Sequence, residues 1–180
     1  ALENYLAALE RYRQAGDLDG VAYIYNNVGM VYQRQAQYDD ALASFEDALE
    51  IRLEMNISQR EIGSTYANIA SIYMEKAEYE TALRYDSLAL DIFEDTDDQY
   101  RIASTVNNMG IILGKLGKID EAIAYSKRAL AIKKKINTDD SGKVLLQNIP
   151  DTAKRKLKNA AQESPLQGGG RRPGGVNPTP

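Results

Sequence analysis

The sequence contains no cysteine, no histidine and no tryptophan among its 180 residues. The absence of cysteine excludes disulfide bonds and thiolate metal sites, which fits a reducing compartment. Without histidine, the chain lacks the side chain most often used for proton transfer near neutral pH and the commonest nitrogen ligand of metals. No apolar run approaches the roughly eighteen residues that cross a bilayer, and the first residues do not form a signal peptide. We therefore expect a soluble, cytoplasmic protein that is not an enzyme, holds no cofactor or metal, and has no membrane partner.

Charge is distributed unevenly along the chain. Residues 1–132 carry 12 Lys and Arg against 22 Asp and Glu, whereas residues 133–180 carry 10 against 4. Two arginines among the glycines of 168–172, without interleaved aromatic residues, are a weak signal for nucleic acid. We therefore expect no nucleic-acid partner.

A repeat runs through most of the sequence. The segment 27–32 (NVGMVY) recurs at 68–73 (NIASIY) and at 108–113 (NMGIIL), at steps of 41 and 40 residues. A second segment, 38–42 (YDDAL), matches 79–83 (YETAL) and 119–123 (IDEAI), and a third, 48–51 (ALEI), matches 89–92 (ALDI) and 129–132 (ALAI). A fixed period of this length is the signature of a stacked repeat architecture.

The spacing of apolar residues inside each unit is helical. Ala41, Leu42, Phe45, Ala48 and Leu49 follow one face of a 3.6-residue period, and the opposite face is charged. The breaks between helices fall at 35–37, 76–78 and 116–118, and only the third contains a glycine, the residue that most easily ends a helix in a left-handed conformation. Each unit is therefore predicted to be a pair of helices.

Small residues recur where the paired helices should meet. They are Gly29, Ala70 and Gly110 on the first helices, and Ala41, Ala82 and Ala122 on the second. Such residues let the two axes approach closely.

These motifs resemble the tetratricopeptide repeat family, and the resemblance covers about three-quarters of the chain. It implies an all-α, superhelical solenoid of antiparallel helix pairs with about three and a half repeats. The long unit resembles variants found in bacterial signalling proteins and in motor or spindle-orientation adaptors. The aromatic residue expected midway along the second helix is Phe45 in the first unit, whereas the nearest equivalents, Tyr85 and Tyr125, are displaced by one position.

The repeat also sets the predicted domain boundaries. The opening segment, with Leu2, Ala8 and Leu9 at the places of Leu42, Ala48 and Leu49, matches a second helix, so 1–15 is predicted to be half of a truncated repeat. The predicted parts are full repeats at 17–56, 57–96 and 97–137, which complete a solenoid over 1–137, then a basic capping or linker helix at 138–163 and a disordered Gly/Pro-rich tail at 164–180. A truncated repeat has lost its neighbour and can pair with another copy, which predicts self-association as one alternative function.

The predicted function is protein–protein interaction, with a peptide or protein segment held in the concave groove lined by the first helices. Asn27, Asn68 and Asn108 form one row along it, and an amide side chain both donates to and accepts from an extended backbone. In the longer-unit members that this chain resembles, asparagines at this point hold ligand main chain; the alternative is that they bond neighbouring helices. The other predicted groove residues are Asn26, Asn107, Tyr23, Met30, Arg34, Ser64, Ser71, Glu75, Ser104, Ile111 and Lys115.

Three further motifs are candidate functional features. The acidic residues Asp95, Asp97 and Asp98 lack the glycine and distant glutamate of a helix-loop-helix calcium site, and are interpreted as a solvated loop. The segment 141–143 (SGK) lacks the remainder of a phosphate-binding loop. Finally, 141–158 is similar to the linker that precedes the catalytic domain of class III nucleotide cyclases, which makes a regulatory cyclase fragment the enzyme-class alternative to a bacterial signalling or scaffolding module.

Overall fold

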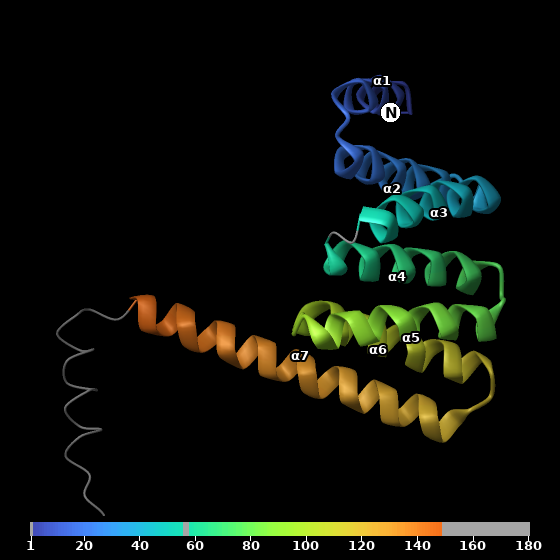
Figure 1. The fold of residues 1–180 in the computed structure, drawn as a ribbon. Helices are drawn as coiled ribbons and strands as arrows, with labels where there is room; N and C mark the ends of the chain where they lie inside the picture. The colour runs from blue at the N-terminus through green and yellow to red at the C-terminus, as the bar shows by residue number, and fades with distance from the viewer. Residues whose placement is uncertain (1, 56–57, 149–180) are drawn as a thin grey trace, which may run out of the picture. The chain divides into compact units, whose positions relative to one another are not determined.

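The structure is a computed structural model and describes residues 2–55 and 58–148, with side chains up to residue 137. The chain divides into two units, Ala1–Asn137 and Thr138–Pro180, and the fold described below is that of the first. Over the described residues there are seven helices and no strand (Figure 1). The helices are α1 (Leu2–Ala15), α2 (Leu18–Arg34), α3 (Tyr38–Met55), α4 (Gln59–Glu75), α5 (Tyr79–Asp95), α6 (Gln99–Lys115) and α7 (Ile119–Asn148).

Each helix packs against its neighbours in the sequence. The most extensive contacts join α2 to α3 and α4 to α5, while α1 packs on α2, α3 on α4, and α5 on α6. Helix α7 continues the series, because Ala129 lies in one core cluster with Val106 of α6 and Phe93 of α5. Helix α2 also contacts α4, the first helix of the next repeat. The predicted all-α solenoid of about three and a half repeats is therefore confirmed, with α2, α4 and α6 as first helices and α1, α3, α5 and α7 as second helices (Figure 1).

Every turn between two helices contains one residue in the left-handed conformation. The three predicted breaks are confirmed, but the first two use alanine, with φ of 57° at Ala36 and 59° at Ala77, where the third uses Gly117 at 76°. An L-residue in this region costs roughly 1–2 kcal/mol because its Cβ crowds the backbone. Among the described residues, those in this conformation are Gly16, Ala36, Ser58, Ala77, Asp97 and Gly117. The turn geometry is thus imposed by helix packing at four non-glycine positions.

Two aspartates cap first helices. Asp17 Oδ1 accepts from the backbone N–H of Gly20 at 2.9 Å and begins α2, and Asp98 Oδ1 accepts from that of Arg101 at 3.2 Å and begins α6. These bonds satisfy donors that a helix N-terminus leaves without an intrahelical partner. Part of the acidic cluster is therefore structural, because Asp97 makes the left-handed turn and Asp98 is a cap rather than a solvated carboxylate.

The close approach of paired helices is confirmed at the small residues. A Cβ added to Gly29 would lie 2.7 Å from the Phe45 ring, and one added to Gly110 would lie 3.1 Å from Ser126 Oγ. The position of Phe45 in the repeat is taken by Asp86 in α5 and by Ser126 in α7. Asp86 is 1% exposed, and its Oδ1 has no hydrogen-bond partner among the described residues. Burial therefore raises the pKa of Asp86 to about 7.

A buried arginine joins the first repeat to the second. The guanidinium of Arg52 on α3 donates to Thr65 Oγ1 on α4 at 2.6 Å and lies 3.8 Å from the carboxylate of Glu61. Only 1% of Arg52 is exposed, and burial lowers its pKa against the opposing effects of Glu61 and Asp19. This contact fixes α4 against α3 across residues 56 and 57, which the structure does not describe.

Helix α7 continues without a break past the predicted end of the repeat at residue 137 and ends at Asn148. The segment 141–158 that resembles a cyclase linker therefore begins inside this helix, and its residues 149–158 lie outside the described part of the chain, as does the predicted tail at 164–180. Within the described residues, no helix combines the length and the apolar character that a membrane span requires.

Candidate functional site

The predicted groove residues all lie on the first helices and occupy equivalent places there. Tyr23, Asn27, Met30 and Arg34 follow one side of α2, and the repeat places their counterparts on α4 and α6. The counterparts are Ser64, Asn68, Ser71 and Glu75 on α4, and Ser104, Asn108, Ile111 and Lys115 on α6. A single face of three successive helices therefore carries the predicted site.

Between α2 and α4, polar side chains bond directly across the helices. Asn68 Nδ2 donates to Asn26 Oδ1 at 3.2 Å, and Gln33 Nε2 donates to Ser71 Oγ at 2.9 Å. Both pairs are partly buried. At Asn68 the donor group is thus used by a neighbouring helix, which is the alternative to ligand binding that the sequence left open.

Between α4 and α6, the same face is hollow. A cavity of about 250 Å³ is lined by eight residues, of which four belong to the predicted site. Ala67 stands at the place of Asn26, so α4 has no amide at the position that would accept from Asn108, and Asn108 makes no side-chain hydrogen bond among the described residues. The amide of Asn108 is half-buried and can still donate to and accept from a bound molecule. The lining residues are Ser64, Ala67, Asn68, Phe93, Arg101, Ser104, Thr105 and Asn108.

Arg101 gives this cavity a positive group with a fixed position. Its Nη1 donates to Asp98 Oδ2 at 2.6 Å, and its guanidinium carbon lies 5.8 Å from the centre of the Phe93 ring. Arg60 Nε, on α4, is 3.2 Å from the same Asp98 oxygen. Burial alone would raise the pKa of Asp98, but the hydrogen bonds from Arg101 and the charges of both arginines outweigh it and lower that pKa. Arg101 is the charged residue among those that line the cavity, and its guanidinium shares the carboxylate of Asp98 with Arg60.

The remaining predicted residues are not part of this cavity. Tyr23 is 57% exposed and lines a separate hollow with Asp19 and Glu61. Asn26, Asn27, Asn107 and Met30 are half-buried, and Asn26 Nδ2 lies 3.8 Å from Met30 Sδ. Arg34, Glu75, Lys115 and Ile111 are exposed toward the C-terminal ends of the three helices. The structure thus brings together Ser64, Asn68, Ser104 and Asn108, and pairs Asn68 with Asn26.

Sequence reasoning missed Arg101, Phe93 and Gln33. Arg60 and Arg101 are 41 residues apart, whereas the register between α4 and α6 is 40, so the repeat pairs Arg60 with Tyr100 and does not identify these two cations as a pair. Phe93 has no sequence signal either, because it comes from the second helix α5 and reaches the cavity through the packing of α5 against α6. Among the described residues, no group of three or more Asp or Glu side chains is arranged to hold a metal ion.

Comparisons with known proteins concern the repeats as a whole. The family model described as Tetratricopeptide repeat matches residues 1–54 and 61–135. No curated protein matches the chain. Among solved structures, BtubC (BKLC) from P. vanneervenii is 25% identical with a TM-score of 0.68, over 98% of this chain and 78% of that protein.

Two further structures are similar over a smaller share of their own length. RapI in its apo form is 26% identical with a TM-score of 0.67, over 73% of this chain and 36% of RapI. The Rap conjugation gene regulator of plasmid pLS20, solved with the Phr* peptide, is 20% identical with a TM-score of 0.62, over 71% of this chain and 36% of the regulator. The chain therefore spans little more than a third of each Rap protein.

Proposed function

Because the chain belongs to the tetratricopeptide repeat family, we propose that it is a non-catalytic interaction module that binds an extended peptide or protein segment on the face formed by α2, α4 and α6. The observation that carries this proposal is the cavity between α4 and α6, where Ser64, Asn68, Ser104 and Asn108 converge. Helical-repeat folds generally act as binding scaffolds, and their concave faces bind extended partners.

The chemistry of this face suits the main chain of a ligand. Ser104 and Asn108 offer both donors and acceptors, and a peptide backbone carries one of each per residue. Asn27 occupies the same repeat position on α2 and, like Asn108, makes no side-chain hydrogen bond among the described residues. Asn27 and Asn108 are therefore proposed as the main ligand contacts, while Asn68 contacts ligand through the part of its amide that Asn26 leaves available.

We further infer that the module is the sensory or scaffolding part of a bacterial signalling protein in the cytoplasm. The likeness to RapI and to the Rap regulator supports this inference, since the latter was solved with a peptide bound. The likeness covers 36% of either protein, so this inference rests on the repeats that they share with the present chain.

The proposal is tested by selecting binders from a random peptide library displayed on phage and measuring their affinity for three proteins. We expect the selected peptides to bind the wild type, and Asn27→Ala with Asn108→Ala to weaken binding at least about tenfold, the effect of roughly one lost hydrogen bond to each amide. A double variant on α5, Glu80→Ala with Asp91→Ala, is the control and should bind normally. Peptides whose affinity is the same for all three proteins would contradict the proposed site, as would a library that yields no binder.

A further inference from the structure

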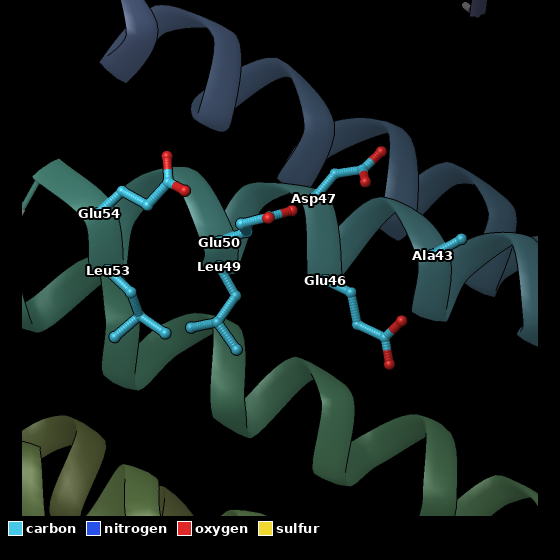
Figure 2. A pocket seen from close by; sticks show the side chains of 7 residues that line it. All are labelled: Ala43, Glu46, Asp47, Leu49, Glu50, Leu53 and Glu54. Carbon is cyan, nitrogen blue, oxygen red and sulfur yellow. The ribbon is translucent and has the colours of Figure 1, made fainter.

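The outer side of α3 carries a hollow that the groove does not explain. A cavity of about 520 Å³ is lined only by residues of this helix, and Figure 2 shows their side chains. Leu49 and Leu53 point to one side of the helix, and the carboxylates of Asp47 and Glu54 point to the other. We call this surface the α3 face, and it consists of Ala43, Glu46, Asp47, Leu49, Glu50, Leu53 and Glu54.

The α3 face combines negative charge with exposed apolar surface. Four of its seven residues are carboxylates, none is basic, and Leu53 is 50% exposed. Burial and the charge of Glu50 raise the pKa of Asp47, and the opposing effect of Arg13 does not compensate. Arg13 itself donates to the hydroxyl of Tyr25. The carboxylates therefore repel one another, and a cation brought against them would be attracted.

The described part of α7 carries a surface of the opposite charge that also exposes apolar side chains. Ile119, Ile123, Lys127 and Leu130 follow one stripe of the helix, with Lys133 beside it, and all five are exposed. Leu130 is 54% exposed, whereas its counterpart Leu90 on α5 is 7% exposed because the next helix covers it. Ile123 is likewise 47% exposed, against 9% for its counterpart Leu42. We call these five residues the α7 face.

We propose that the α7 face of one copy of this chain packs on the α3 face of a second copy. The two surfaces match in both respects, because lysines meet carboxylates while Ile123 and Leu130 meet Leu49 and Leu53. Pairing α7 with α7, or α3 with α3, would place like charges opposite each other. Helices α4, α5 and α6 lie between α3 and α7 in the order of packing, so the two faces of a single copy cannot meet.

The proposed contact is heterologous, because the α7 face of one copy meets a different surface, the α3 face, on the next copy. Such a contact leaves one face of each kind open in a dimer, and therefore extends into a chain or closes into a ring. Association should consequently exceed the dimer as concentration rises. It should weaken with salt, which screens exposed charges over about 10 Å at 0.1 M.

The test is a charge exchange followed by sedimentation velocity. Glu46→Lys with Glu50→Lys and Glu54→Lys makes the α3 face positive, since three lysines then stand beside the single carboxylate of Asp47. Lys127→Glu with Lys133→Glu makes the α7 face negative. Each variant alone should sediment as a monomer where the wild type associates, because each then carries two faces of one sign. An equimolar mixture of the two should associate again, because each face of one variant is then opposite in sign to a face of the other.

Two controls keep this experiment decisive. Glu80→Lys with Asp91→Lys and Asp95→Lys on α5 changes the net charge by the same amount as the α3 variant, away from both faces, and should associate like the wild type. Leu6→Ser on α1, which is 58% exposed, should also leave association unchanged. The proposal is overturned if the wild type stays monomeric from micromolar to millimolar concentration, if the mixture does not associate, or if Leu6→Ser rather than the charge variants abolishes association. If a charge variant loses its helical circular dichroism, Leu53→Gln replaces the α3 change and must reduce association.

Discussion

Asn68 on α4 donates its amide N–H to the amide oxygen of Asn26 on α2, 3.2 Å away, and no such pair exists one repeat later because Ala67 replaces Asn26. The Gln33–Ser71 pair is lost as well, because its counterparts one repeat later are Met74 and Ile111. Two interfaces that the sequence repeat makes appear alike thus differ in their side-chain hydrogen bonds. The first is closed by a hydrogen bond between helices, and the second contains a cavity with an available amide.

The first prediction separates the structural amide from the binding amide. Asn26→Ala should lower the free energy of unfolding by about 1 kcal/mol, because it leaves the half-buried amide of Asn68 without its acceptor. Asn108→Ala should change the stability by less than about 0.5 kcal/mol, since its amide makes no hydrogen bond to lose within the described structure. Urea denaturation of both variants measures the difference, and equal losses would contradict the assignment.

A second prediction concerns the contact of Gly29 with Phe45. Gly29→Leu should lower the free energy of unfolding by roughly 1–3 kcal/mol, because a Cβ alone would already lie 2.7 Å from the ring. Gly114→Ala is the matched control, since its nearest neighbour would be 3.9 Å away, and alanine in a helix is favoured over glycine by about 1 kcal/mol. Thermal unfolding should therefore shift in opposite directions for the two variants.

The turns give a third prediction. Ala77→Gly should raise the free energy of unfolding by about 0.5–1 kcal/mol, because glycine removes the strain of the left-handed conformation. The larger conformational entropy of glycine in the unfolded chain offsets part of that gain. Gly117→Ala should lower it by a similar amount, since it introduces the same strain into the third turn. A destabilised Ala77→Gly variant in chemical denaturation would show that the turn alanine contributes packing instead.

The buried carboxylate of Asp86 predicts a dependence of stability on pH. Its pKa is about 7 in the folded chain and near the model-compound value of 3.8 when unfolded, so the folded state binds the proton more tightly. The contribution of Asp86 to the free energy of unfolding should therefore be greatest below about pH 4 and should fall as the pH rises to about 7. The shift is roughly three pKa units, and at about 1.4 kcal/mol per unit the loss should be about 4 kcal/mol.

Asp86→Asn isolates this effect, because the amide has nearly the same shape and no charge. Denaturation curves collected from acidic to mildly alkaline pH should show a smaller decline for the variant, which becomes the more stable protein above neutrality. If the two proteins decline in parallel across that window, the carboxylate is already ionised in the fold, and the proposed raised pKa is wrong.

Much of the fold follows from the sequence because its signals are local and repeated. Three copies of one apolar pattern at a fixed period indicate helix pairs, and the small residues Gly29 and Gly110 lie where the axes approach closely. The repeat register also placed Ser64, Asn68, Ser104 and Asn108 on one face, where the structure has them. The burial of Asp86 could not be predicted, because the repeat has an aromatic residue at that place and a carboxylate is usually exposed to solvent.

The sequence by itself therefore determined the class of fold, the three breaks between paired helices and the helix face that carries the predicted residues, since each depends on period and composition within one repeat. Only the tertiary structure decided which amide is bonded, where the cavity opens, and that Arg101 and Phe93 belong to it. The physical reason is that hydrogen bonds and cavities between helices depend on pairs of side chains about forty positions apart. A change from asparagine to alanine at one member of such a pair leaves the helical pattern intact, yet it removes the hydrogen bond between the two helices.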